Sequence, residues 1–123
     1  MDKTRILVID DEEEICQLTK SFLSKKNYLV LTATSEAEAI ELIKKERPHL
    51  ALLDMRLGDT SGLDVLRKIK EIDKTIKVIM ITALEDEESV RQAKSLGAED
   101  YITKPFSASY LIDLLSKKIP AGS

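Results

Sequence analysis

Five short apolar runs that alternate with longer amphipathic stretches constrain the fold of this chain more than any other feature. The runs are rich in Val, Ile and Leu and span 6–9, 28–31, 50–53, 76–81 and 101–102. Short runs of this kind are typical of strands covered on both faces, and the stretches between them repeat their apolar residues at helical spacing. Because strands that alternate with helices form parallel sheets with right-handed crossovers, we predict a doubly wound α/β domain.

The amphipathic stretches carry signals for where helices begin and end. The second helix is predicted to begin at Ser35, with Glu38 placed for a capping box, and the fourth to end at Gly97. In the first helix, the apolar residues that share one face are Ile15, Leu18, Phe22 and Leu23. Five helices are expected in all, with one following each strand.

Length and composition indicate a single domain with its own core. The 123 residues suit one domain, expected to cover 1–119 with 120–123 as a tail or the start of a linker. The net charge of −3 argues against direct contact with nucleic acid, which favours basic surfaces. One cysteine cannot form an internal disulfide, and no apolar run approaches the ~20 residues of a membrane helix. We therefore expect a cytoplasmic protein that does not engage membranes.

Polar residues follow four of the predicted strands. Asp10 and Asp11 come after the first run, Asp54 after the third, Thr82 after the fourth and Lys104 after the fifth. Ligands of open parallel sheets bind in the crevice at the carboxyl ends of the strands, so these side chains should meet there. An acidic pocket beside a hydroxyl and an ammonium group suits a divalent metal ion and a phosphoryl group.

The chain resembles the receiver domain of two-component response regulators over nearly its whole length. The matching positions are Asp10, Asp11, Asp54, Gly62, Thr82, Gly97, Ala98, Tyr101, Lys104 and Pro105. The resemblance implies a flavodoxin-like doubly wound sheet with five parallel strands in the order 2-1-3-4-5. It also implies a signalling domain rather than an enzyme. Such a domain assists its own phosphorylation and dephosphorylation.

The resemblance also implies a magnesium-dependent reaction in which a phosphoryl group is transferred to one aspartate, and it assigns a role to several residues around that aspartate. Asp54 would be the phosphoacceptor, and Mg²⁺ or Mn²⁺ would bind Asp11, Asp54 and the backbone carbonyl of Arg56, with Asp10 acting through water. Lys104 would contact the phosphoryl oxygens, and its peptide bond to Pro105 would be cis.

Further roles concern the response to phosphorylation. Thr82 and Tyr101 would form a switch that alters the face made by the fourth helix, fifth strand and fifth helix. The backbone of Met55, Arg56 and Ala83 would contact the phosphoryl group. The side chains of Arg56 and Leu84 would tune its hydrolysis.

One position departs from the family pattern. Gly58 stands where the family usually has proline, and we expect glycine to loosen the loop because it raises the entropy of the unfolded chain. The run Glu12-Glu13-Glu14 also suits the positive N-terminus of a helix, and that role accounts for Glu13 and Glu14.

The resemblance names a sensor histidine kinase or a phosphotransfer protein as partner, a fused or separate output domain, and a phosphorylation-dependent dimer. Two alternatives stay open on the residues. One is a pseudo-receiver that binds partners without phosphorylation, although such domains usually lack an acid or the lysine. The other is a flavodoxin-like or phosphatase-like enzyme, although Asp10-Asp11-Glu12 would repel the phosphate of a flavin.

Overall fold

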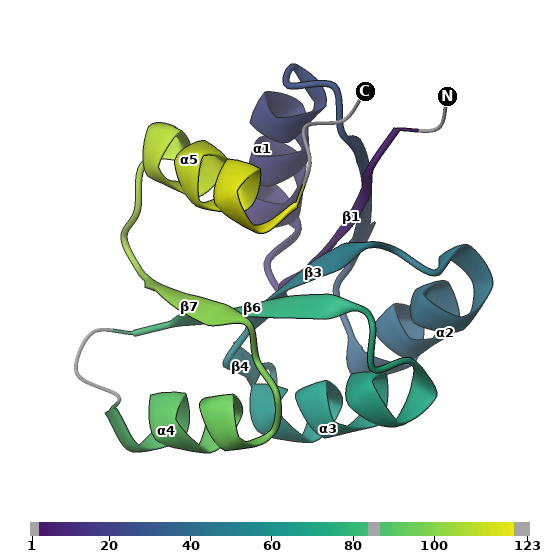
Figure 1. The fold of residues 1–123 in the computed structure, drawn as a ribbon, viewed down its shortest axis with the longest axis vertical. Helices are drawn as coiled ribbons and strands as arrows, with labels where there is room; N and C mark the ends of the chain where they lie inside the picture. The colour runs from purple at the N-terminus through teal and green to yellow at the C-terminus, as the bar shows by residue number, and fades with distance from the viewer. Residues whose placement is uncertain (1–2, 84–86, 120–123) are drawn as a thin grey trace.

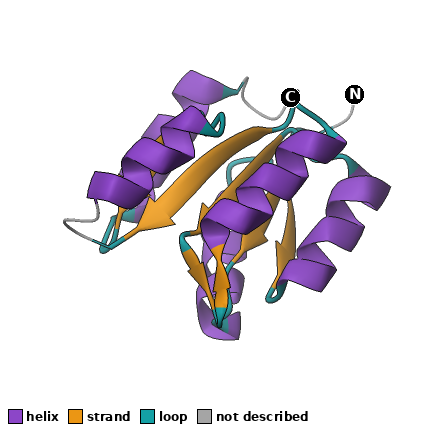
Figure 2. Ribbon diagram, turned by 90° about the horizontal axis from the view of Figure 1, so that it is seen from below, coloured by secondary structure: helices purple, strands orange, loops and turns teal. Residues whose placement is uncertain are grey.

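A parallel sheet between two layers of helices forms the domain (Figures 1 and 2). The computed structural model describes residues 3–83 and 87–119. Five strands make the sheet in the order β2-β1-β3-β6-β7, with every neighbouring pair parallel, which confirms the predicted topology. The strands are β1 (Arg5–Ile9), β2 (Leu29–Ala33), β3 (Leu50–Asp54), β6 (Lys77–Thr82) and β7 (Asp100–Thr103).

Helices cover both faces of this sheet, as the apolar character of the strands predicts. One face carries α1 (Glu13–Ser24) and α5 (Ala108–Lys118) (Figure 1). The other carries α2 (Glu36–Glu46), α3 (Gly62–Ile72) and α4 (Glu87–Ser95). Successive side chains of the central strands alternate between the two cores: Leu7 and Ile9 of β1 enter one, and Ile6 and Val8 enter the other.

The face of α1 that lies against the sheet is rotated from the one its apolar pattern indicates. Cys16, Thr19 and Leu23 are buried, whereas Leu18 is 63% exposed. The Cys16 thiol also donates a hydrogen bond to the Asp10 carbonyl at 3.3 Å, which ties α1 to the end of β1.

The predicted helix boundaries of α2 and α4 agree with the structure. Ser35 Oγ accepts a hydrogen bond from the Glu38 amide at 3.2 Å, and Glu38 Oε1 accepts one from the Thr34 amide at 2.7 Å. This reciprocal pattern satisfies backbone donors that the first turn of α2 leaves free. Gly97 follows α4 at φ +102°, a left-handed conformation that glycine adopts without strain.

A short antiparallel hairpin between β3 and α3 was not predicted. Its strands, β4 (Arg56–Leu57) and β5 (Thr60–Ser61), are joined by Gly58 and Asp59. Gly58 has φ +62° and takes the first central position of this two-residue turn, where tight hairpins favour glycine. The glycine permits a hairpin with positive φ at this position, an angle that proline cannot adopt, and the expected loosening of the loop stays a prediction.

The hairpin closes tightly onto the end of β3. The Gly62 amide donates to the Met55 carbonyl at 2.6 Å. A Cβ atom on Gly62 would lie 2.3 Å from the Asp54 carbonyl oxygen and 2.8 Å from Met55 Cα. Glycine at this position is thus what lets the start of α3 touch the turn that carries Asp54.

Within residues 3–83 and 87–119, none of the helices combines the length and the apolar character needed to cross a bilayer.

Candidate functional site

Three of the polar residues predicted to meet at the carboxyl ends of the strands do meet there, namely Asp10, Asp54 and Lys104. Asp10 directly follows β1, Asp54 ends β3, and Lys104 follows β7. Lys104 Nζ lies 2.8 Å from Asp54 Oδ2 and 3.6 Å from Asp10 Oδ2. The Lys104 amide donates to the Thr82 carbonyl at 2.9 Å, which continues the pairing of β6 with β7 and holds Lys104 over the neighbouring strands. The Lys104–Pro105 peptide bond is cis.

Asp10 is fully buried, and only part of its carboxylate is satisfied. Its Oδ1 accepts from the Glu12 amide at 3.0 Å, while Oδ2 has no hydrogen-bond partner in the part of the chain that the structure describes. Burial raises the pKa of Asp10, and the nearby Asp54 and Asp11 carboxylates act in the same direction. The Glu12 amide and Lys104 oppose this rise only in part. A buried carboxylate oxygen aimed into an acidic cluster is well suited to the field of a cation.

Asp11 adds an exposed carboxylate beside Asp10. Its Oδ2 accepts from the Gly58 amide at 3.1 Å, so the hairpin is tied to the end of β1. One oxygen each from Asp10, Asp11 and Glu12 lies within 4.8 Å of the others. Such a set of hard oxygen donors fits Mg²⁺ or Mn²⁺, which favour carboxylates and retain several waters. Sequence reasoning assigned Glu12 no such role, although its position next to two acids was the available signal.

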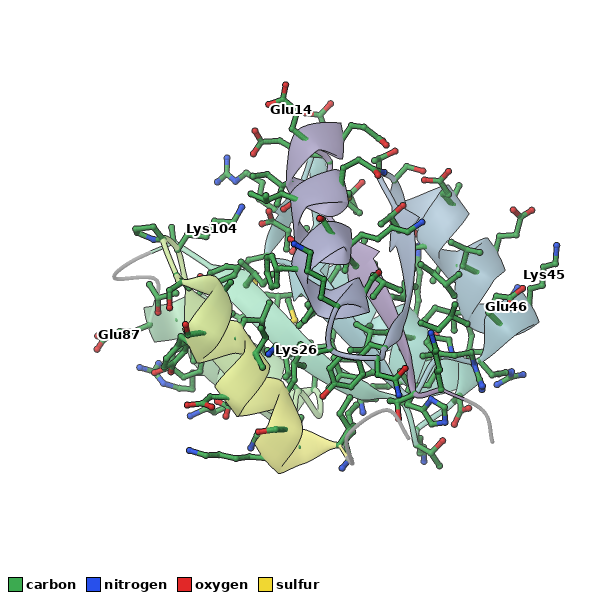
Figure 3. The ribbon with its side chains drawn as sticks, turned by 90° about the horizontal axis from the view of Figure 1, so that it is seen from above. Glu14, Lys26, Lys45, Glu46, Glu87 and Lys104 are labelled. Atoms are coloured by element: carbon green, nitrogen blue, oxygen red, sulfur yellow. The ribbon has the colours of Figure 1, made fainter. Side chains whose placement is uncertain are left out.

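The acidic run beyond this cluster does not join it. Glu13 and Glu14 occupy the exposed first turn of α1, where negative charge complements the helix N-terminus. The Glu14 side chain points outward from the start of α1 (Figure 3).

Asp54 is held in place by two hydrogen bonds and is 8% exposed. Its Oδ1 accepts from the Arg56 amide at 3.0 Å, and its Oδ2 accepts from Lys104. A cleft of about 670 Å³ lies over it, bordered by the hairpin, Ala83, Ser89 and Lys104. Asp54 therefore borders the cleft beside the Lys104 ammonium.

Lys104 keeps its positive charge in this setting. Burial by itself disfavours the ammonium, but the hydrogen bond to Asp54 and the charges of Asp54 and Asp10 outweigh it and raise the pKa of Lys104. The site thus combines a fixed cation with clustered carboxylates.

Comparison with known proteins identifies the family. A response regulator receiver domain matches residues 6–116. The chain belongs to this family. The receiver domain is similar over its whole length to the Sporulation initiation phosphotransferase F of Bacillus subtilis, at 33% identity and with 99% of that relative covered. It is 41% identical over 108 residues to the Regulatory protein VanR of Enterococcus faecium, but covers only 46% of that protein.

Solved structures agree with the fold of this receiver domain. A CheY-like response regulator receiver domain protein of Methanospirillum hungatei superposes with a TM-score of 0.90 at 32% identity. The superposition covers 94% of this chain and 93% of that one. The receiver assignment therefore applies to sequence and fold alike.

Thr82 and Tyr101 each have a partner other than the carboxylates in this conformation of the receiver. Thr82 is 2% exposed, and its hydroxyl donates to the Ala83 carbonyl at 3.3 Å. Tyr101 is 37% exposed, and Lys94 Nζ lies 5.2 Å from the centre of its ring. The Tyr101 ring is thus directed toward the surface, where the Lys94 ammonium adds a favourable cation–π contact.

Of the backbone groups expected to contact a phosphoryl group, Met55 is already engaged. Its amide donates to the Ile81 carbonyl at 2.8 Å as part of the pairing of β3 with β6. It has no second N–H to offer, so the expected Met55 contact does not fit this conformation. Arg56 and Ala83 both border the cleft. Leu84, the second residue expected to tune hydrolysis, lies outside the described residues, as does the expected tail 120–123.

Proposed function

We propose that this receiver domain accepts a phosphoryl group on Asp54 from the phosphohistidine of a sensor histidine kinase or phosphotransfer protein. The observation that carries the proposal is the contact between Asp54 Oδ2 and Lys104 Nζ at 2.8 Å, beside a buried Asp10 oxygen that lacks a hydrogen-bond partner among the described residues. A carboxylate that borders a cleft beside a fixed cation can act as a nucleophile toward phosphorus.

In the proposed reaction, an Asp54 oxygen forms a bond to phosphorus while the phosphorus–nitrogen bond of the donor breaks. The imidazole leaves with the electron pair of that bond, and Asp54 becomes an acyl phosphate. Charge accumulates on the equatorial phosphoryl oxygens during such a transfer, so catalysis depends on positioning and on positive charge. The protonated Lys104 lies where it can bind those oxygens, and the Arg56 amide orients the attacking carboxylate.

A divalent cation, Mg²⁺ or Mn²⁺, would neutralise the clustered carboxylates and the incoming oxygens. Asp11, Asp54 and the Arg56 carbonyl would hold it, with Asp10 acting through water. The clustered oxygens of Asp10, Asp11 and Glu12 and the unsatisfied Asp10 Oδ2 support a cation beside Asp10 and Asp11.

Phosphorylation would be transmitted through Thr82 and Tyr101. The Thr82 hydroxyl, which now donates to Ala83, would turn toward the phosphoryl group, and the Tyr101 ring would move into the space that Thr82 leaves. The surface made by α4, β7 and α5 would change as a result. We propose this surface as the output face, acting on a fused or separate output domain or through a phosphorylation-dependent dimer.

Further parts of the proposal concern lifetime and setting. Arg56, exposed at the border of the cleft, would tune the hydrolysis of the acyl phosphate together with Leu84. The domain would comprise 1–119 and act in the cytoplasm. It would contact neither nucleic acid nor membrane directly.

The test is phosphorylation by a small acyl phosphate donor, followed by intact mass, on wild type and Asp54→Asn. Asp59→Asn is the matched control, because Asp59 borders the same cleft from the hairpin turn. Wild type and Asp59→Asn should each gain one phosphoryl group when Mg²⁺ is present, and Asp54→Asn should gain none.

If no small donor phosphorylates the protein, a beryllofluoride titration distinguishes a receiver that requires its own kinase from a module that is not phosphorylated. A receiver that requires its own kinase should still bind beryllofluoride in the presence of Mg²⁺. The absence of both responses would overturn the proposal in favour of a phosphorylation-independent module.

A further inference from the structure

We propose that the backbone amide of Gly58 is a positioning group that holds Asp11 ready for the divalent cation. The observation is the hydrogen bond from the Gly58 amide to Asp11 Oδ2 at 3.1 Å, between residues 47 positions apart. The inference rests on the proposed use of Mg²⁺ or Mn²⁺ by the receiver. It adds a role for a residue outside the acidic cluster.

The hairpin fixes the direction of this amide. Pairing of Arg56 with Ser61 and of Leu57 with Thr60 sets the register, and the Gly62 amide closes the base on Met55. Gly58 itself has φ +62°, and a Cβ there would meet nothing within 4 Å. Glycine is therefore favoured at this position because of its positive φ angle, and not because a Cβ atom would clash with a neighbour.

The bonded orientation leaves Asp11 able to bind a metal ion. A carboxylate offers about four acceptor sites, and Gly58 occupies one of them. In this same orientation an Asp11 oxygen stays within 4.8 Å of oxygens of Asp10 and Glu12. Without the amide, the exposed Asp11 side chain would be free to rotate away from the like-charged Asp10, and binding would have to restore its orientation. Hydrogen bonds that orient ligating carboxylates are a general feature of metal sites.

The first test compares Mg²⁺ affinity by calorimetry in three variants at one position. Gly58→Asn keeps the amide and tolerates positive φ, and Gly58→Ala keeps the amide but strains the turn. Gly58→Pro removes the amide and also cannot adopt the φ of +62°, so its affinity is interpreted together with the amide protection measured in the second test. We expect Asn and Ala to bind within about threefold of wild type, and Pro to bind about tenfold more weakly. Equal losses in Ala and Pro, or no loss in Pro, would overturn the proposal.

The second test needs no substitution in the protein measured, so it holds even if Gly58→Pro does not fold. Labelling with ¹⁵N-glycine gives a spectrum of only four backbone amides, because the chain has four glycines. The Gly58 signal is the one missing from Gly58→Asn. We expect this amide to exchange slowly with solvent both without metal and at saturating Mg²⁺.

Loss of that protection on addition of Mg²⁺ would show that Gly58 competes with the ion, which contradicts the proposal. A wild-type protein that binds no Mg²⁺ would instead overturn the metal site of the proposed function. Mg²⁺ binding that is indifferent to Gly58 would overturn this inference alone.

Discussion

Substitution of Gly62 by alanine should damage both stability and phosphorylation through a contact of main-chain atoms. Gly62 does not have positive φ, so the alanine backbone itself is unstrained, and helix propensity would favour alanine by up to about 1 kcal/mol. The added Cβ, however, would lie 2.3 Å from the Asp54 carbonyl oxygen and 2.8 Å from Met55 Cα and the Met55 carbonyl oxygen. These atoms belong to the backbone and cannot move aside as a flexible side chain can.

The expected cost follows from the closeness of these contacts. Overpacking typically destabilises by about 1–3 kcal/mol, and we expect about 3 kcal/mol here because β3 or α3 must shift. With a urea slope of about 1.5 kcal/mol per molar, the unfolding midpoint should fall by about 2 M in far-ultraviolet circular dichroism. The shift would also displace Asp54, so phosphorylation by the small donor should slow by at least about tenfold.

Gly58→Ala is the control for this substitution. A Cβ at position 58 meets nothing within 4 Å, so only the strain of a left-handed alanine remains, about 1–2 kcal/mol. Its midpoint should fall by about 0.7–1.3 M with the same urea slope. The reasoning is refuted if Gly62→Ala is as stable as wild type or no less stable than Gly58→Ala.

Two other predictions concern the charge of Lys104 at the site and the ionisation of the buried Cys16 thiol. Lys104→Gln should slow phosphorylation of Asp54 by about a hundredfold without changing the far-ultraviolet spectrum, because a fixed positive charge is lost; an unchanged rate would exclude Lys104 from the reaction. Burial, with the nearby Asp10 charge, raises the pKa of the Cys16 thiol from 9.0 to about 11. The folded thiol keeps its proton in this window while the unfolded thiol loses it, so the free energy of unfolding should fall as pH rises from 9 to 11. Urea midpoints across that range should show the fall in wild type, and Cys16→Ala should lack this part of it.

The charges of the site explain why it is costly for the fold and useful for chemistry. The buried Asp10 oxygen has no hydrogen-bond donor within residues 3–83 and 87–119, and its carboxylate lies near those of Asp54 and Asp11. Only Lys104 lies close enough to form an ion pair with Asp10 within this part of the chain. A domain selected for stability alone would place an apolar residue at position 10, as burial of unpaired charge is unfavourable.

Local pattern was sufficient for the five strands, their parallel arrangement and the helix ends at Ser35 and Gly97, whereas the strand order came from the resemblance to receiver domains. Runs rich in Val, Ile and Leu can be satisfied only between two layers of helices, and short connections allow only right-handed crossovers. The same logic placed Asp10, Asp54 and Lys104 at one edge, because the carboxyl ends of neighbouring parallel strands meet there. Ser35 and Gly97 act through bonds within a few residues, so their roles were also visible in the sequence.

Tertiary structure decided what depends on contacts between distant segments. The buried face of α1 passes through Cys16 and Thr19, whereas Leu18, which the apolar spacing placed on the buried face, is exposed. The hairpin turn at Gly58, with φ of +62°, and the hydrogen bond from its amide to Asp11 were not visible in the sequence. The need for glycine at position 62 is apparent only from the close contact between the start of α3 and the Asp54 carbonyl. Hydrophobic period and capping are encoded locally, whereas close approach of backbones is set by how the packed elements come together.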